Sequence, residues 1–207
     1  MSTILFIKAN DRPSDQAVSV RMYDAFLNAY KEANPSDTVV ELDLYEDNIP
    51  HYGNTTITAL YKSNQGYPLT AEEQEAADIA NRYLNQFLTA DKVVIAFPLW
   101  NYAPPSPLIS YISYLAQAGK TFKYTEQGAV GLAGDKKVAL LSARGGVYSA
   151  QPMDALEAAV RPIRGVLNMI GIEPQELVIE GHNQYKDRSA VILAEGLEAT
   201  AKAASGF

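Results

Sequence analysis

Hydrophobic positions cluster in five short runs along the chain, and each run leads into a polar, proline-containing or glycine-containing segment. The run from Val93 to Phe97 contains no polar residue at all. Continuous runs of this kind are typical of strands that are buried on both faces of a sheet. The predicted strands lie within residues 3–9, 37–45, 92–97, 136–149 and 175–183.

The hydrophobic spacing between these runs changes to that of amphipathic helices. Thr70 stands three residues before Glu73, which is the signature of a capping box at a helix start. Pro162 lies inside one of the helical stretches and predicts a kink or a new helix start there. The predicted helices cover residues 17–33, 70–90, 105–118, 152–171 and 185–204.

Two segments follow neither pattern. Residues 46–69 have no clear period and are rich in Asn, Thr, Tyr and Gly, so we predict a long irregular excursion. Residues 120–135 predict a hairpin. Five strands that alternate with five helices predict an α/β fold with a parallel sheet covered on both faces. The length of 207 residues fits a single domain, residues 1–207.

Composition narrows the class of partner. A formal net charge of -7 argues against nucleic acid or an anionic membrane, because both attract a surplus of Lys and Arg. The chain has no cysteine, which excludes disulfides, thiolate nucleophiles and thiolate metal sites. No apolar run approaches the ~18 residues of a membrane helix, and no signal sequence is recognisable. We therefore expect a cytoplasmic protein that binds a small molecule.

Candidate binding residues follow three of the strands. In an open α/β sheet, ligands bind beyond the carboxyl ends of the strands. The loop after the first strand holds Asn10, Arg12, Ser14, Asp15, Gln16, Ala17, Val18 and Ser19. The loop after the third strand holds Pro98, Leu99, Trp100, Asn101 and Tyr102, and the loop after the fourth holds Ser142, Ala143, Arg144, Gly145, Gly146 and Tyr148.

These three loops suggest the two ends of one ligand. Helix N-terminal amides, the Ser19 hydroxyl and Arg12 suit a phosphate. The aromatic corner suits a flat ring, and Gly145 and Gly146 let the backbone approach such a ring closely. Phosphate at one end and a flat heterocycle at the other describe a mononucleotide such as FMN. On this interpretation, Gly145→Val abolishes FMN binding by a steric clash and leaves the fold intact.

The same residues also fit plainer roles. Trp100 and Tyr102 fit packing at a helix entrance, Gly145-Gly146 fits an ordinary turn, and Ser19 fits a helix start. Signatures of a P-loop, a dinucleotide fingerprint, a hydrolase elbow and a zinc protease are absent. Because the chain offers no evident nucleophile, metal site or acid–base pair, a cofactor would have to supply the reactive chemistry.

Several stretches together resemble one family. They are FPLWNYAPPSPL, LLSARGGVYS, ELDLYEDNIP and GIEPQELVIEGHN, and the match runs in order from the first strand to the last helix. The sequence is similar to the FMN-dependent NADH azoreductase and quinone oxidoreductase family, which is flavodoxin-like. The resemblance implies a five-stranded parallel sheet of order 2-1-3-4-5 and a ping-pong two-electron (hydride) transfer from NADH, through FMN, to a quinone or azo compound.

The resemblance also implies roles for particular residues. Ala17, Val18 and Ser19, with Asn10, would bind the FMN phosphate. Pro98 and residues 99–102 would line the isoalloxazine, while Ala143, Arg144, Gly145, Gly146 and Tyr148 would meet its pyrimidine edge. Ala17 departs from the more serine-rich phosphate loop of many relatives. The family forms homodimers with active sites at the interface, which would make Phe122 and Tyr124 substrate-binding residues and the 46–69 excursion a lid.

Two other classes of function fit the same fold. The first is a flavodoxin-type electron carrier, which has no substrate of its own and which the acidic composition suits. Oxidation of NADH by the protein would favour an enzyme over such a carrier. A flavin-free binding module is the second, because fold does not dictate function. A purified protein that takes up no FMN would favour that module.

Overall fold

A five-stranded parallel sheet forms the centre of the computed structural model, which describes residues 1–207. Its order is β2-β1-β3-β6-β7, and every neighbouring pair is parallel. Because β4 and β5 form a separate hairpin, β6 and β7 are the fourth and fifth strands of this sheet. The strands are β1 (Thr3–Lys8), β2 (Thr38–Asp43), β3 (Lys92–Pro98), β6 (Lys137–Arg144) and β7 (Gln175–Glu180).

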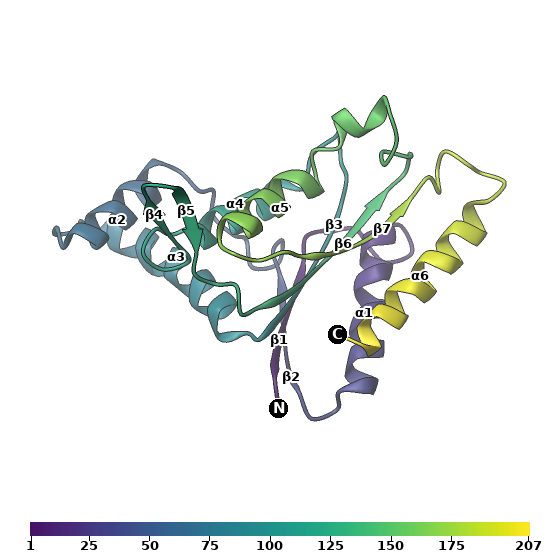
Figure 1. Cartoon of the computed structure of the whole chain (residues 1–207), viewed down its shortest axis with the longest axis horizontal. Coiled ribbons are helices and arrows are strands. Elements are labelled where there is room, and N and C mark those ends of the chain that lie inside the picture. Colours follow the sequence, from purple (N-terminus) through teal and green to yellow (C-terminus); the bar gives the residue numbers. More distant parts are fainter.

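Helices cover both faces of the sheet, as expected. In Figure 1, α1 (Val18–Ala33) and α6 (Ser189–Ser205) lie side by side on one face. The opposite face carries α3 (Ala71–Thr89), α4 (Ser106–Leu115) and α5 (Val160–Met169). Alternate residues of β1 and β3 enter two separate hydrophobic cores, which explains the absence of polar positions in these strands.

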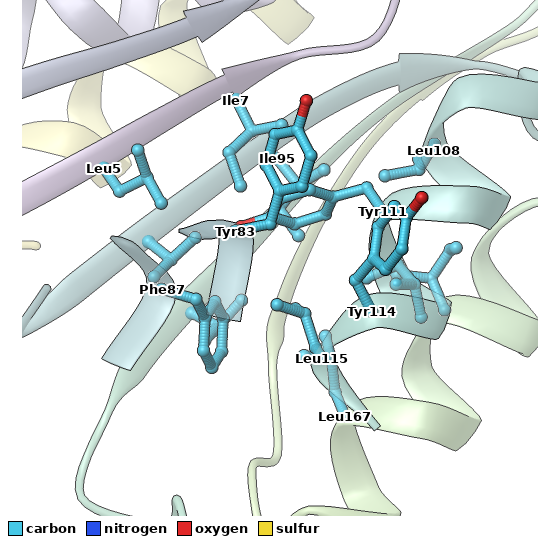
Figure 2. Packing of buried hydrophobic residues seen from close by; sticks show 14 of the residues in the cluster. Leu5, Ile7, Tyr83, Phe87, Ile95, Leu108, Tyr111, Tyr114, Leu115 and Leu167 are labelled. Carbon is cyan, nitrogen blue, oxygen red and sulfur yellow. The ribbon is translucent and has the colours of Figure 1, made fainter. Parts of the chain in front are cut away.

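Tyrosines occupy much of the core beneath α3 and α4. Figure 2 shows Tyr83, Tyr111 and Tyr114 packed among aliphatic side chains of the sheet and of α4 and α5. The rings of Tyr83 and Tyr114 are stacked, with centroids 5.5 Å apart, and Tyr111 meets Tyr83 edge-on at 6.0 Å. These contacts hold α4 against α3, and α4 begins directly after the Trp100 corner.

The prediction of an irregular excursion over residues 46–69 was wrong in its central part. Residues 54–65 form a helix, α2 (Asn54–Gln65), that packs against α3. Gly66 ends it with a φ of 70°, a left-handed conformation that glycine adopts without strain. Thr56 and Ala59 of α2 are buried, and Lys62 pairs with Glu73 of α3 at 2.5 Å, so α2 is stabilised by contacts outside its own sequence.

The predicted helix over residues 152–171 is two elements. A 3₁₀ turn, η1 (Met153–Leu156), is followed by a break and then by α5. The Glu157 carboxylate accepts hydrogen bonds from the amides of Ala159 and Val160, at 3.0 and 2.8 Å, and so caps the new helix. Pro162 lies in the first turn of α5, where its missing N–H costs nothing, which agrees with a new start.

The predicted hairpin is present as β4 (Phe122–Thr125) and β5 (Gly128–Gly131). The end of the hairpin packs directly against the main chain that follows α5. A Cβ on Gly131 would overlap the main chain of Ile170 and Gly171. In Figure 1 the hairpin lies beside α2 and α3, at the end of the molecule away from the C-terminal ends of β6 and β7. No helix is both long and apolar enough to cross a membrane.

Candidate functional site

The N-terminus of α1 offers three amides with no acceptor in the chain. The amides of Ala17, Val18 and Ser19 donate no hydrogen bond, and Ala17, the N-cap, has no side chain that can accept one. The first turn also contains no acidic residue. Because the positive end of the helix dipole is left without a capping group, this position suits a bound anion.

A cavity of about 260 Å³ opens beside these amides, and it joins the first and the last predicted loops. Arg12 and Arg21 bring positive charge to its wall, and Asp15 is the single carboxylate there. The other lining residues are Asn10, Gln16, Ala17, Val18, Ala143, Gly145, His182, Asn183, Ser189 and Leu193.

Asn10 and Ser19 are both buried, and they fix the loop; Asn10 is part of the cavity wall, whereas Ser19 is not. Asn10 Nδ2 donates to Ser19 Oγ at 2.9 Å, and Asn10 Oδ1 accepts from the Arg12 amide at 3.0 Å. The Ser19 side chain does not line the cavity. Both residues therefore organise the candidate anion site, which Arg12, Ala17 and Val18 line.

The Trp100 corner is a tight turn. The amides and carbonyls of Trp100 and Ala103 bond to each other at 2.9 and 3.0 Å, which closes a two-residue loop. Its central residues, Asn101 and Tyr102, have φ angles of 50° and 69°. Such angles are tolerated by asparagine but unfavourable for tyrosine, so Tyr102 is held in a strained conformation that presents its ring at the surface.

The corner and the loop after β6 are joined directly. The Leu99 amide donates to the Ala143 carbonyl at 2.9 Å, next to the Pro98 and Ala143 register pair. The rings of Tyr102 and Tyr148 meet edge-on with centroids 6.0 Å apart. The structure therefore brings the three predicted loops to one edge of the sheet. The loops after β1 and β6 share the cavity, and the loops after β3 and β6 are joined by the hydrogen bond and the ring contact just described.

The last residue of β6 and the loop that follows it, residues 144–149, are together called the glycine loop below. The carbonyl of Gly145 accepts from the amides of Asn183 and Gln184, at 2.9 and 3.1 Å, and the Gly146 carbonyl accepts from Gly181 at 3.2 Å. The amides of Gly145 and Gly146 donate to no group of the chain. Two donors at this edge are thus available to a ligand.

Gly145 has a close neighbour that the sequence did not indicate. A Cβ at this position would lie 2.7 Å from Asn183 Nδ2. Gly145→Val would therefore displace Asn183 whether or not a flat ring is bound, so this substitution does not isolate a clash with a cofactor.

The Arg144 side chain points away from the cavity beside α1. Its Nη1 atom lies 3.5 Å from Glu180 Oε2, and it lines a second cavity of about 430 Å³ on the other side of the glycine loop. Its Nε atom is buried without a partner. The Arg144 side chain is therefore not among the groups around the cavity beside α1, and its predicted role at the pyrimidine edge stays a prediction.

Phe122 and Tyr124 do not reach these loops within one chain. Phe122 is buried in the core, whereas Tyr124 is 76% exposed, and their rings meet edge-on at 5.2 Å. They belong to the hairpin at the other end of the molecule (Figure 1). Their role as substrate-binding residues stays a prediction that needs a second copy of the chain.

Sequence reasoning missed the contribution of the fifth strand. His182 and Asn183 follow β7 and line the same cavity as Arg12 and Arg21. Burial, followed by the nearby Arg21 charge, lowers the pKa of His182. The rule that ligands bind beyond the carboxyl ends of strands already applied to the Gly-His-Asn segment, which would have added both residues.

Taken as chemistry, the edge offers an anion site at one end and ring-binding groups at the other. The free α1 amides and two arginines suit a phosphate, and the free glycine-loop amides with Trp100 and Tyr102 suit a flat, hydrogen-bonding ring. These donors fit FMN. No group in this set is a nucleophile with an adjacent base.

Comparisons with known proteins agree along the whole chain. A family model described as a flavodoxin-like fold matches residues 2–203. The FMN-dependent NADH:quinone oxidoreductase of Brevibacillus brevis is 56% identical over 208 aligned positions, which cover 100% of each chain.

Solved structures give the same result. An azoreductase from Bacillus anthracis strain Sterne has a TM-score of 0.97 and 53% identity, covering 100% of both chains. An FMN-dependent NADH-azoreductase from Bacillus anthracis strain Ames Ancestor, solved in complex with FMN, has a TM-score of 0.87 and 29% identity over 98% of both chains.

Proposed function

Because this chain belongs to the flavodoxin-like family of FMN-dependent NADH:quinone oxidoreductases, we propose that it binds FMN and uses NADH to reduce quinones and azo compounds. The observation that carries the proposal is the set of unpaired amides at one sheet edge, three at the start of α1 and two in the glycine loop. These five donors match the phosphate at one end of FMN and the polar pyrimidine edge at the other. We also propose that the whole chain, residues 1–207, acts as one domain around FMN.

Each group in the site has a proposed task. The amides of Ala17, Val18 and Ser19 and the Arg12 guanidinium hold the phosphate, and Asn10 fixes the loop that carries them. Leu99, Trp100, Asn101 and Tyr102 form one wall for the isoalloxazine. Gly145 and Gly146 donate to its pyrimidine edge, where negative charge accumulates on reduction.

Bound FMN would supply the redox chemistry, by hydride transfer from NADH and two-electron delivery to the acceptor in a ping-pong sequence. The residues of the chain contribute geometry and electrostatics. The turn at Asn101 and Tyr102 presents aromatic surface without further ordering, so little conformational entropy is lost when a flat molecule stacks there. Flat quinones and flat azo compounds can both stack on such a surface.

We also propose that the active unit is a homodimer. Tyr124 is exposed and lies far from the glycine loop of its own chain, so a second copy is needed to bring it to an active site. The partner's hairpin would then cover the acceptor side of the ring.

The deciding experiment is a visible absorption spectrum of the FMN-reconstituted protein, recorded anaerobically before and after NADH and again after a quinone. We expect a flavin spectrum that bleaches with NADH and recovers with the quinone. Bound flavin that NADH cannot reduce would indicate an electron carrier instead. A protein that retains no FMN would contradict the proposed site.

A further inference from the structure

Glu180, the last residue of β7, contacts the glycine loop at three points. Its Oε2 atom accepts from the Tyr148 amide at 2.9 Å and lies 3.5 Å from Arg144 Nη1. Its Oε1 atom accepts from the Ser149 hydroxyl. The three partners flank Gly145 and Gly146 on both sides, so one carboxylate ties both ends of the loop to β7.

The segment after Glu180 fixes the middle of the loop. The Gly145 carbonyl faces the amides of Asn183 and Gln184. Because N–H and C=O point to opposite sides of a trans peptide, this contact turns the Gly146 amide away from residues 183–184. Both anchors act from the C-terminal end of β7 and leave the glycine amides unpaired.

Glu180 is also the only acidic partner of Arg144. The Arg144 side chain is 8% exposed, and its Nε atom has no hydrogen-bond partner. Removing one member of a buried pair leaves an uncompensated charge. The Glu180 carboxylate therefore offsets the charge of Arg144 beside the glycine loop.

We propose that Glu180 is a positioning residue for the flavin: it holds the glycine loop so that the amides of Gly145 and Gly146 meet the pyrimidine edge, and it offsets the Arg144 charge there. This inference rests on the proposed binding of FMN. Glu180 lines the second cavity and not the one beside α1, so we expect it to act through the loop rather than by contact with FMN.

The test compares Glu180→Gln with Glu176→Gln. Glu176 lies four residues earlier on β7, lines the same second cavity, and pairs with Arg164 at 2.9 Å without a hydrogen bond to the glycine loop. Two quantities are measured for each purified protein: the FMN dissociation constant, from quenching of flavin fluorescence, and the midpoint potential of the bound flavin, from anaerobic titration against a reference dye.

For Glu180→Gln we expect the FMN dissociation constant to rise about tenfold, since a charged acceptor for three donors is lost. We expect the midpoint potential to become more positive, because a negative charge near the reduced ring has been removed. Glu176→Gln should match the wild type in both. Equal affinity and potential in the two variants would overturn the proposal.

A milder variant guards against misfolding. Ser149 is exposed, and Ser149→Ala removes one contact while it leaves the charge in place. We expect weaker FMN binding with an unchanged potential, and unchanged affinity would count against the proposal if Glu180→Gln does not fold. A wild-type protein that binds no FMN would instead overturn the proposed function, so the two failures are distinguishable.

Discussion

Strain is concentrated at Tyr102. Its φ of 69° is unfavourable for a tyrosine, and roughly 1–2 kcal/mol is the usual cost for residues other than glycine, asparagine and aspartate. The turn stays in this conformation because the bonds between Trp100 and Ala103 close it and the Ala158 amide donates to the Tyr102 carbonyl at 3.1 Å. A strained residue maintained by its surroundings points to a requirement of the site rather than of folding.

This strain can be measured with two variants that both remove the ring. Glycine adopts a positive φ without strain, so Tyr102→Gly removes the strain, whereas Tyr102→Ala retains it. We expect the glycine variant to be the more stable by about 0.5–1 kcal/mol in urea unfolding of the FMN-free protein. Both variants should bind FMN more weakly than the wild type. An alanine variant as stable as the glycine variant would show that the turn is relaxed.

His182 provides a pH-dependent prediction. Burial and Arg21 lower its pKa below the ordinary value of 6.5. The unfolded chain therefore takes up a proton there before the folded chain does, and stability falls as the pH drops below about 6.5 towards the folded-state pKa. We expect NMR titration to place the His182 pKa below 6.5, and Arg21→Gln or bound FMN to raise it.

His51 is the only other histidine, and it is exposed, so His51→Gln assigns the two sets of resonances without disturbing the cavity. A His182 pKa at or above 6.5 in the FMN-free wild type would contradict the prediction.

Among the elements, α1 and α5 both have an alanine at the N-cap, but only α5 has a substitute acceptor, the Glu157 carboxylate, for its first amides. Ser, Thr, Asp and Asn are the common N-cap residues because their side chains accept from the first amides of the helix. Alanine leaves those amides without an acceptor in the chain. In the proposed site, the helix gives up local stability in the FMN-free protein in exchange for phosphate binding.

Two substitutions at Ala17 separate these effects. Ala17→Asp and Ala17→Asn should both raise the stability of the FMN-free protein by about 1 kcal/mol, measured by urea unfolding. Ala17→Asp should also weaken FMN binding by at least about tenfold, since its carboxylate repels the phosphate. The loss for Ala17→Asn should be smaller. Equal FMN affinity in the aspartate and wild-type proteins would place the phosphate elsewhere.

Elements with strong local signals were predictable from the sequence, and those made by distant contacts were not. The Thr70 and Glu73 capping box is present at the start of α3, where the Thr70 side chain accepts from the Glu73 amide. By contrast, α2 has no capping side chain and few buried residues, and the Lys62–Glu73 pair attaches it to α3. Gly66 after it was the one local signal of a helix end.

The same division holds in the site. The three loops were predictable, because parallel strands place their carboxyl ends at one edge. The direction of the Arg144 side chain was not, because it depends on Glu180, which lies 36 residues further along the chain. The contact of Gly145 with Asn183 was not predictable either, because it forms only when β6 and β7 are paired.

At the scale of the whole molecule, the glycine loop and the hairpin lie at opposite ends of the sheet (Figure 1). We predict that Tyr124→Ala raises the KM for the quinone at least severalfold and leaves the FMN dissociation constant unchanged, because only a second copy delivers this ring. Lys123→Ala, the neighbouring exposed position on β4, serves as the control. Steady-state kinetics together with sedimentation analysis would check this, and an unchanged KM in a dimeric enzyme would exclude Tyr124 from the acceptor site.

The backbone contact between Gly131 and Gly171 bears on how the range of acceptors can be changed by engineering. No side chain separates the main chain at Gly131 from the main chain at Gly171, so the base of the hairpin is tightly packed. A larger residue at either position would displace the whole tip of the hairpin. Libraries that aim at bulkier dyes or quinones should therefore diversify positions 123–130 and leave both glycines untouched. Selection would then act on the shape of the tip while its anchorage stays constant.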